Sequence, residues 1–287
     1  MMKQETAGNE KRSDEPMFVI EKGYAVAEGT KLYYETAGAG ETVLLIHGAF
    51  MTSAIWDSTF AALSDRYRVV RYDWRGMGKS GMGDTPYRAY DDVRGLLDAL
   101  EIDKAHVVGL SAGGYIAVEL SLAYPQRVRS LSLVGAGLFG LPESERLQAD
   151  NARFYGAASS GDIEGMLREW TQMWLYGPDQ PKSRVKPSVI ARFEQLSLES
   201  LSRSESFEMP LTLVPAPIGR LAEIVAPTLV AWGSLDYQDT KEAANMFSGT
   251  IPGARTAELN GSAHIPPMDD PQRFNEALGG FLDGLRA

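Results

Sequence analysis

Short apolar segments rich in β-branched residues alternate along the chain with longer amphipathic segments. Residues 43–46 and 229–231 are apolar at every position, which is expected for strands covered by helices on both faces. This alternation is typical of βαβ units around a mostly parallel sheet. The pattern predicts strands at 31–36, 42–47, 68–72, 106–110, 130–134, 228–232 and 255–259.

Amphipathic segments between these strands predict helices. They cover residues 54–63, 91–100, 112–124, 240–247 and 271–285. Pro125 ends the third of them, and Pro271 occupies the first turn of the last, where proline is tolerated. The sequence therefore predicts an α/β fold with helices on both faces of the sheet.

The alternation stops between residue 140 and about residue 217, where no strand pattern is found. Within this stretch, 162–176 has a helical periodicity that places large apolar side chains on one face: Met166, Leu167, Trp170, Met173 and Trp174. The polar segment 196–206 is also helical in pattern. We expect a helical insertion over the sheet. Residues 1–16, which are polar and dense in charge, are expected to form a disordered tail.

The overall composition limits the possible partners. The chain has 287 residues with 44% hydrophobic and 23% charged positions, which is ordinary for a globular protein. A formal charge of -10 disfavours nucleic acid and anionic membranes as partners. Without cysteine there is no disulfide, thiolate metal site or cysteine nucleophile. No apolar run approaches the roughly 20 residues of a membrane span, so the cytoplasm is the expected location. The oligomeric state stays open.

A candidate nucleophile lies between a predicted strand and a predicted helix, in Gly109-Leu110-Ser111-Ala112-Gly113. A serine at such a turn takes a strained backbone conformation, and only small residues at 109 and 113 let the helix approach the strand. GxSxG in this context is the pattern of a nucleophile elbow. Alone, the pattern is only weakly specific.

A serine nucleophile needs a base, and the base needs a partner that fixes its tautomer. Of the three histidines, His47 ends one predicted strand and His106 begins another, so His264 is the one in a late loop. The acid is expected after the strand 228–232, where Asp236 is the first choice and Asp239 the alternative. The order serine, acid, histidine is the one expected for this type of fold.

A tetrahedral intermediate needs two hydrogen-bond donors for its oxyanion, and backbone N–H groups usually supply them. Ala112, which follows the serine, is one expected donor. Ala49, in His47-Gly48-Ala49-Phe50 after the strand 42–47, is the other. His47 itself is interpreted as structural.

Five motifs in this order give a resemblance to the α/β-hydrolase superfamily: HGAF at 47–50, DWRGMGKS at 73–80, GLSAGG at 109–114, PTLVAWGSLD at 227–236 and GSAHIPPMDDP at 261–271. Together they cover nearly the whole core. The chain is most similar to the small carboxylesterases, the 3-oxoadipate enol-lactonase-like hydrolases and the cofactor-free haloperoxidase-type perhydrolases.

This resemblance implies the α/β-hydrolase fold, with a mostly parallel twisted sheet, helices on both faces and a helical cap inserted after the sixth core strand. The cap would be 138–217, and the core domain 17–137 and 218–287. The resemblance also implies a catalytic Ser111, Asp236 and His264, with no metal or cofactor. Epoxide hydrolases and haloalkane dehalogenases, which have an aspartate at the position of Ser111, are disfavoured. Residues 73–80 are interpreted as a structural turn.

The substrate pocket is expected to involve Phe50, Leu110, Trp170 and Trp174. Arg184 or Arg192 could bind a substrate carboxylate, although solvated arginines are commoner. The predicted function is a serine hydrolase of carboxylic esters or lactones with a small-molecule substrate. The alternatives are a carbon–carbon bond hydrolase of 1,3-dicarbonyls or a cofactor-free perhydrolase on the same triad, and, with less support, a non-catalytic ligand receptor of this fold.

Overall fold

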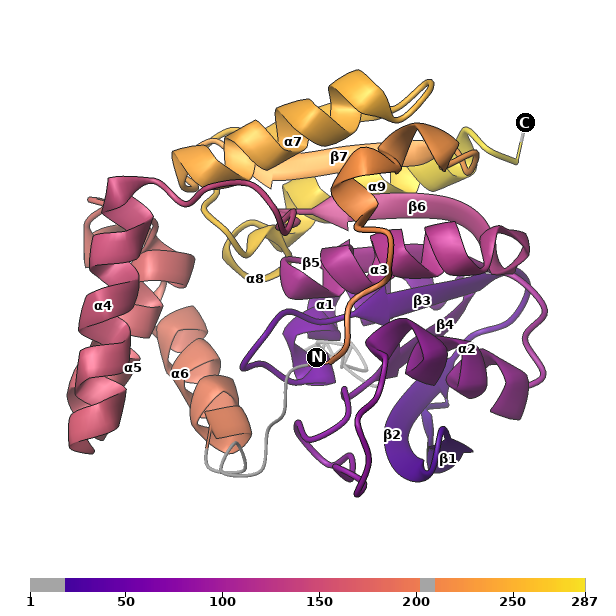
Figure 1. Cartoon of the computed structure of the whole chain (residues 1–287), viewed down its shortest axis with the longest axis horizontal. Helices are drawn as coiled ribbons and strands as arrows, with labels where there is room; N and C mark the ends of the chain where they lie inside the picture. The colour runs from indigo at the N-terminus through magenta and orange to yellow at the C-terminus, as the bar shows by residue number, and fades with distance from the viewer. Residues whose placement is uncertain (1–18, 202–209, 287) are drawn as a thin grey trace, which may run out of the picture.

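The computed structural model describes residues 19–201 and 210–286 (Figure 1). Within these residues an eight-stranded sheet has the spatial order β1-β2-β4-β3-β5-β6-β7-β8. Neighbours from β4 to β8 pair in parallel, whereas β2 pairs antiparallel with both β1 and β4. The predicted mostly parallel sheet is confirmed. The strands are β1 (Glu21–Ala27), β2 (Thr30–Ala37), β3 (Thr42–Ile46), β4 (Arg68–Tyr72), β5 (Ala105–Leu110), β6 (Val128–Val134), β7 (Thr228–Gly233) and β8 (Arg255–Leu259).

Each of the seven predicted strands is present with ends within two residues of the prediction, and β1 is an additional strand that the pattern did not predict. In β1 the large side chains of Tyr24 and Val26 are exposed, while Ala25 and Ala27 are buried. A half-buried strand usually buries its large apolar side chains. In β1 the small residues face the protein and the large ones face solvent. This strand forms one edge of the sheet.

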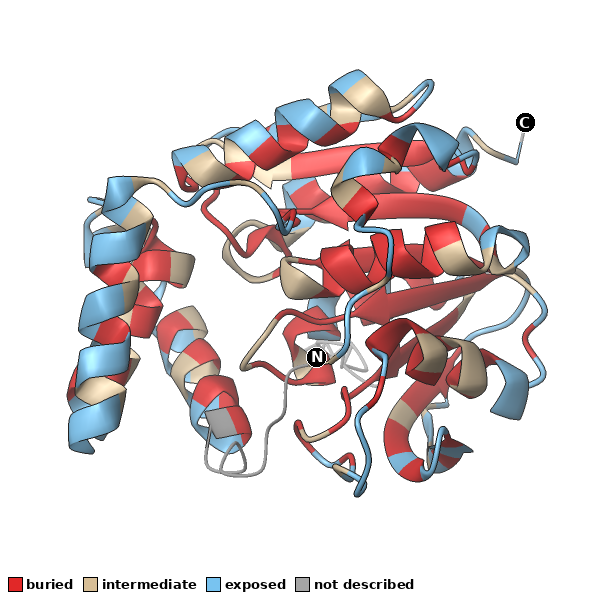
Figure 2. Cartoon of the chain, viewed as in Figure 1, coloured by how far each residue is buried: buried red, intermediate tan, exposed pale blue. Residues whose placement is uncertain are grey.

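Helices cover both faces of the sheet, as the continuous apolar strands predict (Figure 1). On one face lie α2 (Ala89–Ala99), α3 (Ala112–Ala123) and α7 (Gln238–Thr250), and on the other lie α1 (Asp57–Leu63) and α9 (Pro271–Asp283). In β3, Leu44 packs into the first apolar cluster and Leu45 into the second. Burying each such side chain stabilises the fold by about 1.5 to 3 kcal/mol. Figure 2 shows the central strands as buried, whereas the edge strands β1 and β8 are exposed or half-buried at most positions.

Three longer helices lie between β6 and β7 in the chain: α4 (Glu145–Ser160), α5 (Ile163–Thr171) and α6 (Pro187–Leu201). We call them the inserted helices. They stand beside the sheet, at the left of Figure 1. Ser144 caps α4 by accepting a hydrogen bond from the Leu147 N–H, and Asp162 caps α5 by accepting one from the Gly165 N–H. Such caps satisfy N–H groups that the first helical turn leaves unpaired.

The apolar face predicted for 162–176 is formed by α5 and a π-helical turn at Gln172–Tyr176. Its Met166, Trp170 and Met173 side chains are buried in the same cluster as the second face of the sheet. Shorter helical segments are Ser53–Trp56, Pro125–Arg127, Lys182–Arg184, Pro217–Gly219, Leu221–Glu223 and α8 (Pro266–Asp269). We propose that the inserted helices and their connections, 138–217, act as a cap.

The expected tail, 1–16, and the end of the polar segment 196–206 lie outside the described residues. In the part of the chain that is described, no helix combines the length and the apolar character needed to cross a membrane.

Candidate active site

Ser111 occupies the turn from β5 into α3 and has a backbone conformation that L residues rarely adopt, with φ 55° and ψ -121°. Its N–H donates to the Val134 carbonyl over 2.8 Å, which ties the turn to β6. A Cβ atom on Gly113 would lie 2.3 Å from the His47 carbonyl oxygen, and one on Gly109 would lie 2.3 Å from the Gly113 oxygen. The two glycines therefore let α3 pack directly against the strands, and the surrounding structure holds Ser111 in its strained conformation.

The imidazole of His264 lies between Ser111 and Asp236. Its Nε2 is 2.9 Å from Ser111 Oγ, and its Nδ1 is 2.7 Å from Asp236 Oδ2. His264 and Asp236 are almost fully buried, at 4% and 3% exposed. Because a carboxylate only accepts hydrogen bonds, Nδ1 carries the proton and Nε2 is left to accept the serine hydroxyl hydrogen. The structure thus brings together three residues that are far apart in the chain.

Asp239, the alternative acid, has a different partner. Its two carboxylate oxygens accept hydrogen bonds from the Ser144 N–H over 2.6 Å and from the Ser144 hydroxyl over 2.7 Å. Ser144 is the N-cap of α4. Asp239 therefore joins the first turn of α7 to an inserted helix, and Asp236 is the acid beside His264.

The two expected oxyanion donors lie next to the serine. Ala112 follows Ser111 at the start of α3. Ala49 lies in the loop after β3. This loop comes close to Ser111, since a Cβ atom added to Gly48 would lie 3.2 Å from Ser111 Cβ. Among the residues that the structure describes, no hydrogen bond is found from the N–H of Ala49 or Ala112. Both N–H groups therefore stay candidates for donating to an oxygen atom bound at Ser111.

His47 is a buried structural residue, as interpreted from the sequence. Its Nε2 accepts the Trp74 N–H over 3.1 Å, so its Nδ1 carries the proton and donates to the Gly48 carbonyl over 2.7 Å. Burial lowers the pKa of this imidazole, although the nearby Asp73 carboxylate opposes the shift. Asp73 in turn accepts the N–H groups of Ser53 and Lys79, so the 73–80 segment is a hydrogen-bonded turn.

A family model described as "Alpha/beta hydrolase family" matches residues 43–277. The chain belongs to the alpha/beta hydrolase family. The fold expected from the resemblance is thereby confirmed, and solved lactone-degrading and enol-lactonase enzymes are among the structures similar to it.

Several proteins are similar to this alpha/beta hydrolase over most of their length. It is 31% identical over 266 residues to RutD of Azorhizobium caulinodans, named as a candidate carbamate hydrolase, with 90% of this chain and 97% of the relative covered. It is 28% identical to the 2-hydroxy-6-oxononadienedioate/2-hydroxy-6-oxononatrienedioate hydrolase of Paraburkholderia phymatum, with 88% and 92% covered. The solved enol-lactonase of Burkholderia xenovorans LB400 superposes with a TM-score of 0.76 at 26% identity, with 91% and 100% covered.

Two cavities of this alpha/beta hydrolase meet at the candidate nucleophile, and Ser111, Trp174 and His264 line both of them. The smaller cavity, about 160 Å³, is aromatic and includes Phe50 and Trp170 in its lining. The larger, about 240 Å³, lies between the start of α3, the 137–143 segment and the start of α7. Three of the four predicted pocket residues are thus brought together. The fourth, Leu110, is fully buried and is not among the described residues that line either cavity.

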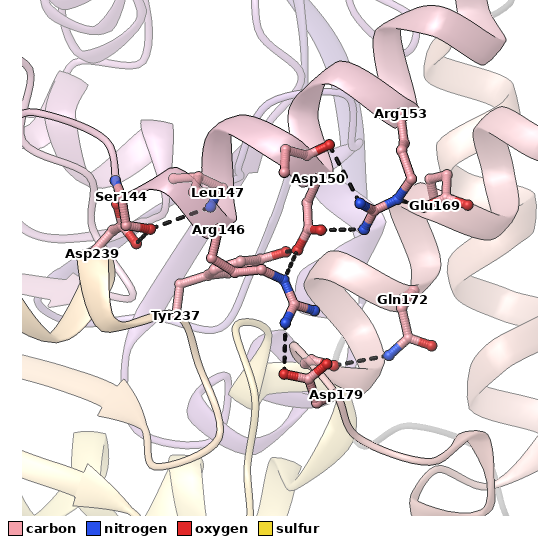
Figure 3. A network of polar contacts seen from close by, with 12 residues as sticks. Ser144, Arg146, Leu147, Asp150, Arg153, Glu169, Gln172, Asp179, Tyr237 and Asp239 are labelled. Carbon is pink, nitrogen blue, oxygen red and sulfur yellow. Dashed lines mark hydrogen bonds and ion pairs between the residues drawn. The ribbon is translucent and has the colours of Figure 1, made fainter.

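A network of polar contacts, which the sequence analysis did not predict, joins α4 to the residue after Asp236 (Figure 3). The Tyr237 hydroxyl donates to Asp150 Oδ2 over 2.6 Å, and Arg146 donates to the same oxygen over 2.7 Å. Arg153 pairs with the other oxygen of Asp150 and with Glu169. The ring of Trp174 packs on Tyr237, with centroids 5.4 Å apart, and on His264, at 4.4 Å. Trp174, in the turn after α5, therefore contacts His264 directly, whereas α4 reaches Asp236 through Tyr237.

Arg184, from the segment before α6, forms a second link between the chain connecting α5 to α6 and the site. Its guanidinium donates to the Tyr176 carbonyl over 2.9 Å, to the Gly261 carbonyl over 3.0 Å and to Asp269 over 3.0 Å. Asp269 is buried, which raises the pKa of its carboxyl group, and it accepts the Ala263 N–H over 2.7 Å. These contacts hold the loop that carries His264. The sequence does place an acid, Asp269, five residues after His264. Nothing in the sequence pattern indicates that Arg184 is its partner.

A larger polar cavity, about 600 Å³, lies away from Ser111. Several of its charged residues form ion pairs: Arg71 binds Glu35 and Asp57, and Arg192 binds Asp57 over 3.1 Å. Arg192, one of the two arginines considered for substrate binding, thus belongs to this cavity.

In residues 19–201 and 210–286 no group of three or more acidic or histidine side chains could hold a metal ion.

Proposed function

We propose that this protein is a serine hydrolase of carboxylic esters or lactones that acts through an acyl-enzyme on Ser111. One observation carries the proposal: His264 Nε2 lies 2.9 Å from Ser111 Oγ while its Nδ1 lies 2.7 Å from Asp236. A serine hydroxyl becomes a useful nucleophile at neutral pH only when a positioned base takes its proton. The arrangement meets that requirement.

In the first half of the reaction, Ser111 Oγ forms a bond to the substrate carbonyl carbon as His264 Nε2 takes the hydroxyl proton. Asp236 accepts the hydrogen bond from Nδ1 and stabilises the imidazolium. The tetrahedral intermediate then breaks its bond to the leaving alkoxide oxygen, which receives the proton from His264. In a lactone this alcohol stays attached to the acyl group.

In the second half, water replaces the alcohol. His264 takes a proton from the water as its oxygen attacks the acyl carbon, and then returns the proton to Ser111 Oγ as the ester bond to the enzyme breaks. A carboxylic acid leaves and the free serine is restored. In both halves the N–H groups of Ala49 and Ala112 would donate to the negatively charged oxygen, and removing one such donor typically lowers kcat by about 100- to 1000-fold.

Relatives support both the proposal and one alternative. The enol-lactonase neighbour, at 26% identity, supports a lactone or ester substrate. The relative from Paraburkholderia phymatum, at 28% identity, is named as a hydrolase of 2-hydroxy-6-oxononadienedioate, and this name supports the alternative, a carbon–carbon bond hydrolase that would use the same triad. The two reactions share Ser111, His264 and Asp236, so the substrate decides between them.

The test is a panel of a p-nitrophenyl ester, a lactone and a vinylogous 1,3-diketone, each assayed with the wild type and Ser111→Ala. We expect the esters or lactones to turn over, and Ser111→Ala to lower kcat by about 10⁴- to 10⁶-fold. A fluorophosphonate probe should label the wild type and Ser58→Ala, which removes an exposed serine of α1, but not Ser111→Ala. Turnover of the diketone alone would replace ester hydrolysis with carbon–carbon bond hydrolysis. Equal labelling of all three proteins would exclude Ser111 as the nucleophile.

A further inference from the structure

We infer that the cavities at Ser111 select esters and lactones whose substituents are uncharged or positively charged, and that they discriminate against substrates carrying a carboxylate. This inference rests on the proposed function and deepens it, because it specifies the charge of the substrate. It is carried by the residues that line the two cavities and by the contacts of the nearby arginines.

The smaller cavity offers an uncharged aromatic surface. Among its described lining residues are Phe50, Phe154, Trp170 and Trp174, and none is a lysine, arginine, aspartate or glutamate. A cavity of about 150 Å³ with an apolar lining is large enough for a benzene-sized group, and this one has about 160 Å³. An ionised carboxylate placed here would lose its hydration without gaining a cation, which is strongly unfavourable.

The larger cavity combines apolar and acidic lining residues. Its apolar lining includes buried Leu138 and half-exposed Phe139, and its acidic lining residues are Glu143, Asp239 and Glu242. Asp239 is held in place by Ser144. In the described residues the three acids accept hydrogen bonds from neutral groups, Asn151 for Glu143, Gln238 for Glu242 and Ser144 for Asp239, and no ion pair with a lysine or arginine is found for them. Glu143 and Glu242 are exposed. Their uncompensated charge gives this cavity a negative potential, which attracts cations and repels anions.

The nearby arginines are already committed to other partners. Arg184 donates to backbone carbonyls and to Asp269, and Arg192 pairs with Asp57 at the separate polar cavity. Arg146 pairs with Asp150 and Asp179. A substrate carboxylate would therefore have to break one of these ion pairs to obtain a cationic partner. The dicarboxylate named for the Paraburkholderia phymatum relative has the charge that this arrangement disfavours.

The experiment compares p-nitrophenyl esters that differ in the charge of the acyl group. The uncharged ester is p-nitrophenyl 5,5-dimethylhexanoate, its cationic isostere is p-nitrophenyl 4-(trimethylammonio)butanoate, and the anionic ester is p-nitrophenyl hydrogen glutarate. A second series places the charge on the alcohol, with 3,3-dimethylbutyl acetate, acetylcholine and 3-acetoxypropanoate. In both series we expect kcat/KM for the anion to be at least about tenfold below that for the uncharged ester. In at least one series the cation should match or exceed the uncharged ester, by a margin that salt reduces.

Variants test whether the acids cause the selection. Replacing both exposed acids, as Glu143→Gln with Glu242→Gln, should lower the ratio of kcat/KM for cationic over uncharged ester by about three- to tenfold. Glu276→Gln, which removes one charge from α9 and lines neither cavity, should leave that ratio unchanged. Glu242→Lys should raise kcat/KM for the anionic ester.

The outcomes separate this inference from the proposed function. If the uncharged esters are hydrolysed through Ser111 but the anionic ones are hydrolysed equally fast, the charge selection is wrong and the serine hydrolase stands. Selection that persists unchanged in the double variant would show that Glu143 and Glu242 do not cause it. If no uncharged ester or lactone is hydrolysed at all, the proposed function fails, and this inference fails with it.

Discussion

Tyr237 donates its hydroxyl hydrogen to Asp150 over 2.6 Å, although the two residues lie 87 positions apart in the chain. Asp150 belongs to α4, while Tyr237 directly follows Asp236, the acid beside His264. The Tyr237 N–H also donates to Asp236 Oδ1 over 2.7 Å. One tyrosine thus connects an inserted helix to the carboxylate that orients the histidine.

We expect Tyr237→Phe to lower the free energy of unfolding by about 1 to 2 kcal/mol, because buried Asp150 loses a hydrogen-bond donor while its ion pairs with Arg146 and Arg153 remain. We also expect a reduction of kcat on an ester by about three- to tenfold, since the loop holding Asp236 is less firmly positioned. Urea unfolding and steady-state kinetics measure the two effects. Tyr24→Phe, on the exposed edge strand, is the control. An unchanged unfolding midpoint would show that the hydroxyl contributes nothing to stability.

The two acids considered for the triad can be separated by matched substitutions. Asp236→Asn should lower kcat by about 10⁴-fold while the protein stays folded, because the amide no longer holds the productive tautomer of His264. Asp239→Asn keeps an acceptor for Ser144 and should lower kcat on an uncharged ester by less than about tenfold. Circular dichroism checks that both variants fold. The opposite order of effects would assign the acid to Asp239.

The close approach of α3 to β3 predicts a steep cost for a single methyl group. In Gly113→Ala the new Cβ would meet the backbone oxygens of His47 at 2.3 Å and Ile46 at 2.5 Å, and neither can move without disturbing the sheet. We expect a loss of at least about 3 kcal/mol of stability, measured by denaturant unfolding. Gly156→Ala, in α4 with no atom within 4 Å of the added Cβ, should instead stabilise by up to about 1 kcal/mol. Equal stability of the two variants would contradict this account.

Glu119, a buried residue of α3, gives the protein a pH-dependent stability. Burial raises the pKa of its carboxyl group to about 7, against the hydrogen bonds from the Leu213 N–H and Tyr115, and the like charge of Asp91 raises it further. The protonated form is thus favoured in the folded state. The stabilisation is present below the ordinary pKa of 4.5 and is lost as the pH rises through about 7.

Between pH 5 and pH 8 we expect the unfolding free energy of the wild type to fall by an amount on the order of 2 kcal/mol. Glu119→Gln mimics the protonated form, so we expect the variant not to show this fall. Unfolding free energies of wild type and variant across this pH range measure it. Glu101→Gln, near the end of α2, should follow the wild type. A variant whose stability declines with pH as steeply as the wild type would show that Glu119 does not titrate in this range.

Much of the fold follows from local sequence. The strand β3 is apolar at each of positions 43–46 because both of its faces are covered, and such runs can be recognised without a structure. β1 escaped prediction because its buried positions are alanines while Tyr24 and Val26 face solvent. A pattern based on large apolar residues assigns such a strand to the wrong face or to none.

The candidate site divides in the same way. Ser111 and His264 could be predicted because a strand-to-helix turn and a late loop leave few residues to choose from. The larger cavity could not be predicted. It forms where residues 137–143 lie against the first turn of α7, and no local sequence pattern indicates that these two segments are in contact. The partners of Tyr237 and Arg184 likewise depend on how the inserted helices pack, which is a property of the tertiary structure.

Arg184 ties the segment between α5 and α6 to the loop of His264 through Gly261 and Asp269. One guanidinium therefore holds together the segment before α6 and the loop that carries the candidate general base. We expect a displacement of that segment to shift the imidazole relative to Ser111 as well, so catalysis by the proposed triad would depend on where the inserted segment lies.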